Sequence, residues 1–170
     1  MIDNKNGFTL LELLIAAALI SVLAMFATQA FRASASDVRI ADAQARASLL
    51  VNAAQRYYIE YPNATAFAVG DTNVLQAFAQ PGTCLTHGSY SDSPQQLVNC
   101  GFLEYRQIAY DSKRTNNDKV EFSASVNMWF ASVSPETAAV EVCFQGKGRV
   151  TDRCTYCTTN GNDFSKACSE

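Results

Sequence analysis

Six cysteines are the side chains best equipped for chemistry in this 170-residue chain. They are Cys84, Cys100, Cys143, Cys154, Cys157 and Cys168. An even count at this density is typical of disulfide bonding in an oxidising, exported location, and six cysteines allow fifteen pairings. Because Cys84 and Cys100 lie in one connecting segment, we favour a bond between them and two more bonds among the other four.

The spacing of Cys154 and Cys157 leaves other chemistry open. Two intervening residues are typical of a zinc knuckle, for which Cys143 and Cys168 could be further ligands, and of a redox-active pair. The polar surroundings of this pair do not match the strand-to-helix junction that is typical of a redox pair. Covalent haem attachment needs a histidine directly after the second cysteine, and this chain has Thr158 there. Disulfides are the favoured interpretation, and we assign no metal and no cofactor.

Catalytic constellations are sparse in this sequence. The one histidine, His87, lies in a glycine- and serine-rich loop, and the motifs of a nucleophile elbow or a phosphate-binding loop are absent from the sequence. Asn116, Asn117 and Asp118 carry oxygen ligands suited to calcium, but their spacing favours a hairpin turn. We therefore expect a protein that is not an enzyme.

Composition bounds the class of protein. Hydrophobic residues make up 48% and charged residues 17% of the chain, which excludes a highly charged disordered chain and a polytopic membrane protein. The formal net charge is -3, so nucleic acid is not the expected partner. Lys147, Arg149 and Arg153 form a modest basic patch that leaves DNA contact open.

A single acid interrupts the most apolar segment of the chain. From Phe8 to Thr28, Glu12 is the only charged residue, and about 20 apolar residues cross a bilayer as one helix. A charged group at bilayer depth costs about 3 kcal/mol on insertion scales, and such residues are rare without a partner. The segment therefore predicts one membrane span that contains an acid in need of a cation.

Proteolysis would supply that cation. No Lys, Arg or His lies between Lys5 and Arg32, so the nearest available cation is the amine made by a cut between Gly7 and Phe8. This amine would lie one helical turn from Glu12 of its own chain, and within reach of Glu12 of a parallel neighbour. The second arrangement builds a polymer.

The residues GFTLLELLI, from Gly7 to Ile15, resemble the processing and assembly motif of bacterial type IV pilins and type II secretion pseudopilins. The resemblance covers about the first 30 residues closely and the rest only in architecture. It implies that a prepilin peptidase cuts after Gly7 and N-methylates Phe8. It also implies that Glu12, the fifth mature residue, orders subunit docking.

Two ordinary interpretations compete with this one. Ala33, Ser34 and Ala35 could form a signal-peptide cleavage site, which would leave a mature start at Ser36, and a plain signal anchor needs no assembly role. Both leave Glu12 unexplained. Small residues recur every three or four positions at Ala17, Ser21, Ala24 and Thr28. They would allow parallel helices to pack closely, but they are equally consistent with an ordinary alanine-rich helix.

One feature departs from the family pattern. Many type IV pilins carry a glycine and then a proline in the second half of the apolar segment, whereas this chain has neither between Gly7 and Pro62. Because these residues break helices, their absence predicts a continuous helix and leaves open the choice between pilin and pseudopilin.

Periodicity predicts the elements that must carry these residues. Apolar residues at three- or four-residue spacing extend the helix from Phe8 to Tyr61, where Pro62 ends it. Strict alternation predicts strands at 120–130 and 140–144, with a weaker strand at 104–110. Two short helices, at 73–80 and 94–100, are expected in the connector, opened by Thr72 and Ser93.

The resemblance implies an α+β type IV pilin fold: a long helix on a three- or four-stranded antiparallel sheet, with a disulfide-stapled tail. The expected segments are a removed leader (1–7), a membrane and filament-core half (8–30), and a globular domain (31–170) made of helix to residue 61, connector (62–103), and sheet with tail (104–170).

The function implied is that of a filament subunit serving motility, adhesion or DNA uptake. The expected partners are further copies of the chain, a prepilin peptidase, the inner membrane and its assembly machinery. The expected location is the inner membrane and then an extracellular pilus. The alternatives are a minor pilin or pseudopilin of a secretion system and a membrane-tethered, non-polymerising cysteine-rich binding module.

Overall fold

The computed structural model describes residues 10–70, 73–85, 93–108, 112–114, 120–122, 126–146 and 154–168. The chain divides into two compact units, and the boundary falls between Arg39 and Ile40. Helix α1 (Leu10–Glu60) contributes residues to both. This confirms the predicted helix apart from its ends; Phe8 and Thr9 lie outside the described residues.

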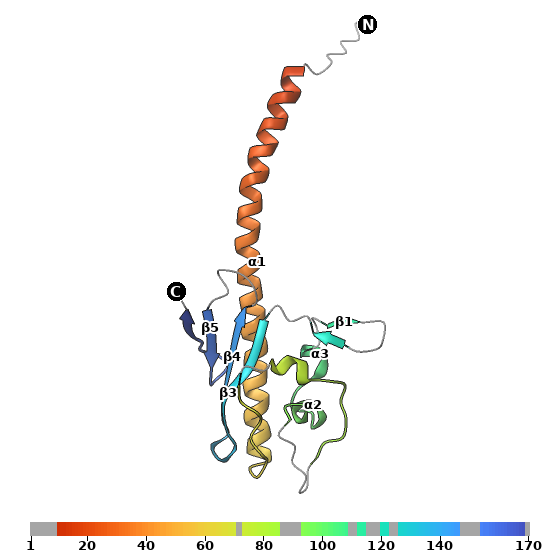
Figure 1. The fold of residues 1–170 in the computed structure, drawn as a ribbon, viewed down its shortest axis with the longest axis vertical. Coiled ribbons are helices and arrows are strands. Elements are labelled where there is room, and N and C mark those ends of the chain that lie inside the picture. Colours follow the sequence, from red (N-terminus) through yellow and green to blue (C-terminus); the bar gives the residue numbers. More distant parts are fainter. Residues whose placement is uncertain are drawn as a thin grey trace, which may run out of the picture. The chain divides into compact units, whose positions relative to one another are not determined.

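The second half of α1 carries the predicted apolar stripe. Ala43, Ala47, Leu50, Ala54 and Tyr57 are all buried at helical spacing. Val51, Ala53 and Tyr58 are buried as well, so the stripe is wider than one row. Burial on a wide face requires cover from more than one direction, and Figure 1 shows the sheet and the connector helices on either side of this half of α1.

Four antiparallel strands form the main sheet in the order β3-β4-β5-β6. They are β3 (Val126–Ser134), β4 (Ala139–Gly146), β5 (Cys154–Thr158) and β6 (Ser165–Cys168). Met128, Phe130, Val142 and Phe144 join the core cluster with α1. Alternation therefore predicted the buried face of β3 and β4 correctly.

The predicted strand at 104–110 is wrong. The structure has helix α3 (Tyr105–Ile108) there. Tyr105 is half-buried and Ile108 buried, while Arg106 and Gln107 between them are exposed, which is a helical spacing. The Gln107 amide donates to the Glu104 carbonyl at 3.0 Å and closes the first turn. Over so few residues, helical and alternating patterns cannot be told apart.

The predicted strand at 120–130 is two strands with different partners. β2 (Val120–Phe122) pairs with β1 (Ser112–Arg114) in a separate two-stranded sheet, and β3 begins at Val126. Alternation identifies extended backbone but not its partner. A strand pairs most readily with a neighbour close in the chain, and β1 is only a short connection away from β2.

The connector contains the two expected short helices in reduced form. Helix η1 (Val74–Ala77) is a 3-10 turn capped by Asn73, whose Oδ1 accepts from the Leu75 amide. Helix α2 (Gln96–Asn99) follows a turn in which Ser93 Oγ accepts from the Gln95 amide at 3.3 Å. Thr72 lies outside the described residues.

The C-terminal tail, expected as a stapled loop, forms β5 and β6 instead. The turn between these strands docks on α1: Ser48 Oγ donates to the Gly161 carbonyl, and Gln55 Nε2 donates to the Thr159 carbonyl at 2.8 Å. The tail is too polar for alternation to reveal it, because among its described residues, 154–168, the large apolar side chains packed against the core are Tyr156 and Phe164.

Gly161 at this turn should not tolerate a side chain. Its φ is +75°, and an added Cβ would lie 3.2 Å from Ser48 Cα. Gly161→Ala is expected to lower the free energy of unfolding by about 2 to 3 kcal/mol, since left-handed backbone alone costs about 1 to 2 kcal/mol. Denaturant unfolding of the full chain in detergent measures the change.

Gly101 provides the matched control, because its φ is +78° and nothing lies within 4 Å of an added Cβ. Gly101→Ala should therefore show the backbone cost alone. If both variants lost the same free energy of unfolding, the close contact between Gly161 and α1 would not explain the loss at Gly161.

Candidate assembly segment

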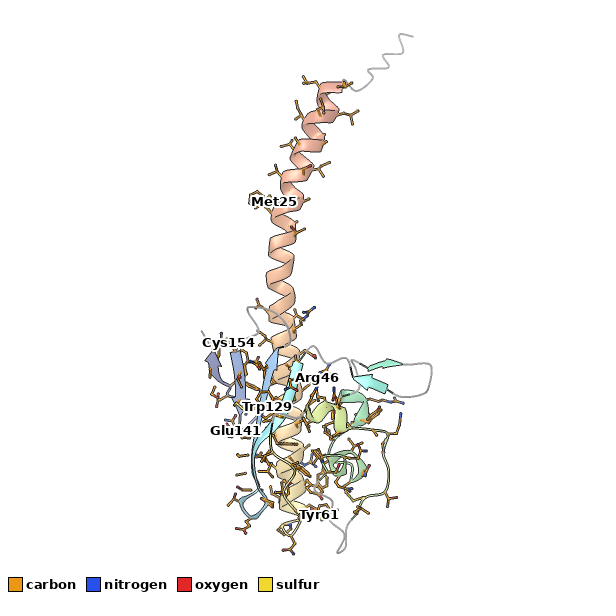
Figure 2. All side chains as sticks on the ribbon, viewed as in Figure 1. Met25, Arg46, Tyr61, Trp129, Glu141 and Cys154 are labelled. Carbon is orange, nitrogen blue, oxygen red and sulfur yellow. A yellow bond between two sulfur atoms is a disulfide. The ribbon has the colours of Figure 1, made fainter. Side chains whose placement is uncertain are left out.

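The first half of α1 is an apolar surface with no cover. Leu10–Thr28 has a mean hydropathy of 2.5, and none of it is buried. Leu10 is 77% exposed and Phe26 67%, and Figure 2 shows the side chains of this half, including Met25, pointing outward along the helix. A surface of this kind needs lipid or other apolar helices around it.

The hydroxyl side chains of the segment suit an apolar environment. Ser21 Oγ donates to the Ala17 carbonyl at 2.8 Å, and Thr28 Oγ1 donates to the Met25 carbonyl at 2.9 Å. Hydroxyls bonded back to their own helix leave no unsatisfied donor in hydrocarbon. The segment is long enough and apolar enough to cross a bilayer.

Glu12 lies in the first described turn of α1 and is exposed. An acid near a helix N-terminus interacts favourably with the helix dipole. A single carboxylate at the start of the otherwise uncharged segment Leu10–Thr28 can select a cation, either within its chain or on a neighbour. Gly7 and Phe8, the expected processing site, lie outside the described residues.

Comparison with known proteins agrees with this pattern. Residues 2–28 match the family model described as the prokaryotic N-terminal methylation motif. The chain carries a type IV prepilin-like N-terminus. No match was found among curated proteins or among solved structures.

The fold agrees with this N-terminal match. The structure has the parts of the α+β type IV pilin fold. These are a long helix with an apolar first half and an amphipathic second half, a four-stranded antiparallel sheet, and disulfides in the C-terminal region. The match to the methylation motif implies processing by a prepilin peptidase, and the exposed apolar helix fits anchoring in the inner membrane. The N-terminal segment is therefore like that of a type IV pilin or pseudopilin.

All six cysteines are paired in the structure. Cys84 bonds to Cys100, Cys143 to Cys157, and Cys154 to Cys168. The last two bonds join residues that face each other directly across neighbouring strands. Cys154 and Cys157 are thus in different bonds, which leaves no thiolates for the zinc knuckle that their spacing allowed.

Arg46 is a buried residue whose role the sequence pattern did not reveal. Only 7% of the residue is exposed, and it forms an ion pair with Asp42 at 3.0 Å. Its Nη1 also donates to the Ile108 carbonyl at 3.4 Å, which ties α3 to α1. The signal for it was Asp42 one helical turn before, a spacing that favours an ion pair.

The tyrosines near the end of α1 pack against one another and against Phe67. Tyr57 contacts Tyr58, Tyr61 and Phe67, with ring centroids 5.1 to 5.5 Å apart. Tyr58 Oη donates to the Thr65 carbonyl and accepts from the Phe67 amide at 2.9 Å. Burial raises the pKa of the Tyr58 hydroxyl well above its usual range, although the Phe67 amide opposes this shift.

Several candidate residues fall outside the described part of the chain. These are His87, the oxygen-rich group Asn116, Asn117 and Asp118, and the basic patch Lys147, Arg149 and Arg153.

Proposed function

We propose that this chain is the structural subunit of a type IV pilus filament. It is made as an inner-membrane precursor, cut after Gly7, methylated at Phe8 and then moved from the bilayer into the filament by the pilus assembly machinery. The apolar segment Leu10–Thr28 carries this proposal, because it is exposed along its whole length and interrupted by a single acid.

Such a segment suits two environments in turn. Lipid covers it before assembly, and the same face packs against neighbouring apolar helices afterwards. The Phe8 amine of one subunit would neutralise Glu12 of the next. A buried charge that is tolerated only beside its partner makes docking selective for one register. The sheet and the disulfide-stapled strands would face outward.

A second candidate, a minor pilin or pseudopilin of a secretion system, is favoured by the continuity of α1. The helix runs from Leu10 to Glu60 without the glycine and proline that many type IV pilins carry. Both candidates share the processing and the docking step. They differ in filament length and abundance, which imaging of filaments from the native organism would distinguish.

The intact mass of the mature chain tests the processing step. We expect a chain that begins at Phe8 and carries one added methyl group, and a Gly7→Val variant that keeps its leader. A mature chain that begins at Met1 would indicate a plain anchor, and one that begins at Ser36 would indicate a secreted protein. Either result would contradict the proposed function.

A further inference from the structure

A cleft of about 620 Å³ is lined by residues of the connector and of helix α3 with the residue before it. Its lining includes Gln80, Pro81, Asn99, Glu104, Tyr105 and Arg106. Sites for small ligands typically enclose about 300 to 1,000 Å³ and combine apolar walls with a few polar groups. The cleft therefore has the size of a ligand site.

One wall of the cleft is held rigidly by side-chain amides. Gln95 Oε1 accepts from the Ala79 amide at 2.7 Å, and its Nε2 donates to the Ala79 and Gln80 carbonyls. Asn99 Oδ1 accepts from the Gly82 amide at 2.8 Å. The disulfide from Cys84 to Cys100 fastens the same segment to the end of α2.

The opposite wall is fixed where α2 turns into α3. Gly101 has a φ of +78°, and the Leu103 amide donates to the Leu97 carbonyl at 2.9 Å. Leu103 and Ile108, before and after the lining residues Glu104, Tyr105 and Arg106 in the sequence, are buried, and Arg46 Nη1 donates to the Ile108 carbonyl. Both walls are thus fixed before any ligand arrives, which lowers the entropic cost of binding.

The polar groups of the cleft are both donors and acceptors. Glu104, Arg106 and Gln80 are exposed. Asn99 Oδ1 already accepts from Gln95 Nε2 and from the Gly82 amide, so the Asn99 Nδ2 group is the part of this side chain available as a donor. Tyr105 and Pro81 add flat apolar surfaces beside these groups.

We propose that this cleft binds a saccharide. Among the described residues, the lining has one acid and one base and thus no net charge, which disfavours phosphates and nucleic acid, and these exposed charges disfavour lipid. Neighbouring hydroxyls of a sugar can donate to Glu104 and accept from Arg106 and the side-chain amides, while the apolar face of the sugar ring lies on Tyr105. The proposal goes beyond the filament role, since the cleft belongs to the folded domain whether or not the chain polymerises.

The test uses the full chain in micelles of a zwitterionic detergent, because glycoside detergents carry sugars that would compete. We expect binding to an array of immobilised neutral and acidic oligosaccharides. Titration with the best-bound oligosaccharide should also slow hydrogen exchange at residues 104–106. Arg106→Ala and Glu104→Gln should each raise the Kd for this oligosaccharide at least tenfold. Both side chains are exposed, so the thermal unfolding midpoint should stay the same.

Glu136→Gln is the matched control, since Glu136 is an exposed acid on the turn helix η3 (Pro135–Thr137) and does not line the cleft. It should bind as the unmodified chain does. The proposal is overturned if no oligosaccharide binds, or if Arg106→Ala and Glu104→Gln bind with unchanged Kd. Neither outcome bears on the filament role.

Discussion

Replacing Glu12 with valine is expected to leave a processed and folded chain that no longer enters filaments. Valine removes the charge from the apolar segment, so insertion into the bilayer becomes easier rather than harder. A loss of filaments would therefore reflect docking and not anchoring. Without the carboxylate, the Phe8 amine of the neighbouring subunit would enter the filament core unpaired, at a cost that is large in apolar surroundings.

The measurement is the share of chain recovered in sheared filaments against the share left in membranes, in cells that hold the assembly machinery. We expect the filament share to fall at least tenfold. Glu136→Val makes the same substitution at an exposed turn and should leave the share unchanged. Filament yield at the level of the unmodified chain in Glu12→Val would contradict the charge-pairing mechanism.

Elements with strong periodicity could be predicted from the sequence, and elements held by sparse contacts could not. The helix and the faces of β3 and β4 follow from apolar residues that recur over many positions, because burial of one face imposes that recurrence. α3 (Tyr105–Ile108) has a single turn, and so few residues do not separate a helical pattern from an alternating one in the sequence. β5 and β6 contain mostly polar residues, and their place in the sheet depends on disulfides and on the docked turn at Gly161.

The functional residues also differ in how well the sequence predicts them. Glu12 stands out in the sequence because one acid in an apolar run violates the pattern around it. The cleft could not be predicted, since its lining comes from two stretches of the chain, 80–81 and 98–106, that are brought together by Gln95, Asn99 and the bond between Cys84 and Cys100. The burial of Arg46 could not be predicted either, because helical spacing does not reveal its contact with the Ile108 carbonyl of α3.

The cross-strand bond between Cys143 and Cys157 should be the largest single contributor to the order of the C-terminal strands. β6 is exposed throughout, and on β5 only Thr158 is fully buried. The two strands therefore bury too little apolar surface to stay paired by packing alone. In the chain-entropy model, a bond that closes a loop of about 15 residues stabilises the folded state by about 3 kcal/mol.

The double variant Cys143→Ala and Cys157→Ala is thus expected to lose about 3 kcal/mol of unfolding free energy and to expose the amides of β5 and β6 to rapid hydrogen exchange. Cys84→Ala with Cys100→Ala is the matched control, because its loop has a sequence separation of 16 against 14. That control should lose a similar free energy but leave β5 and β6 protected, since the connector it loosens also has the amide contacts of Gln95 and Asn99. Protected amides in β5 after loss of the Cys143 bond would show instead that the docked turn and the bond between Cys154 and Cys168 suffice to hold the strands.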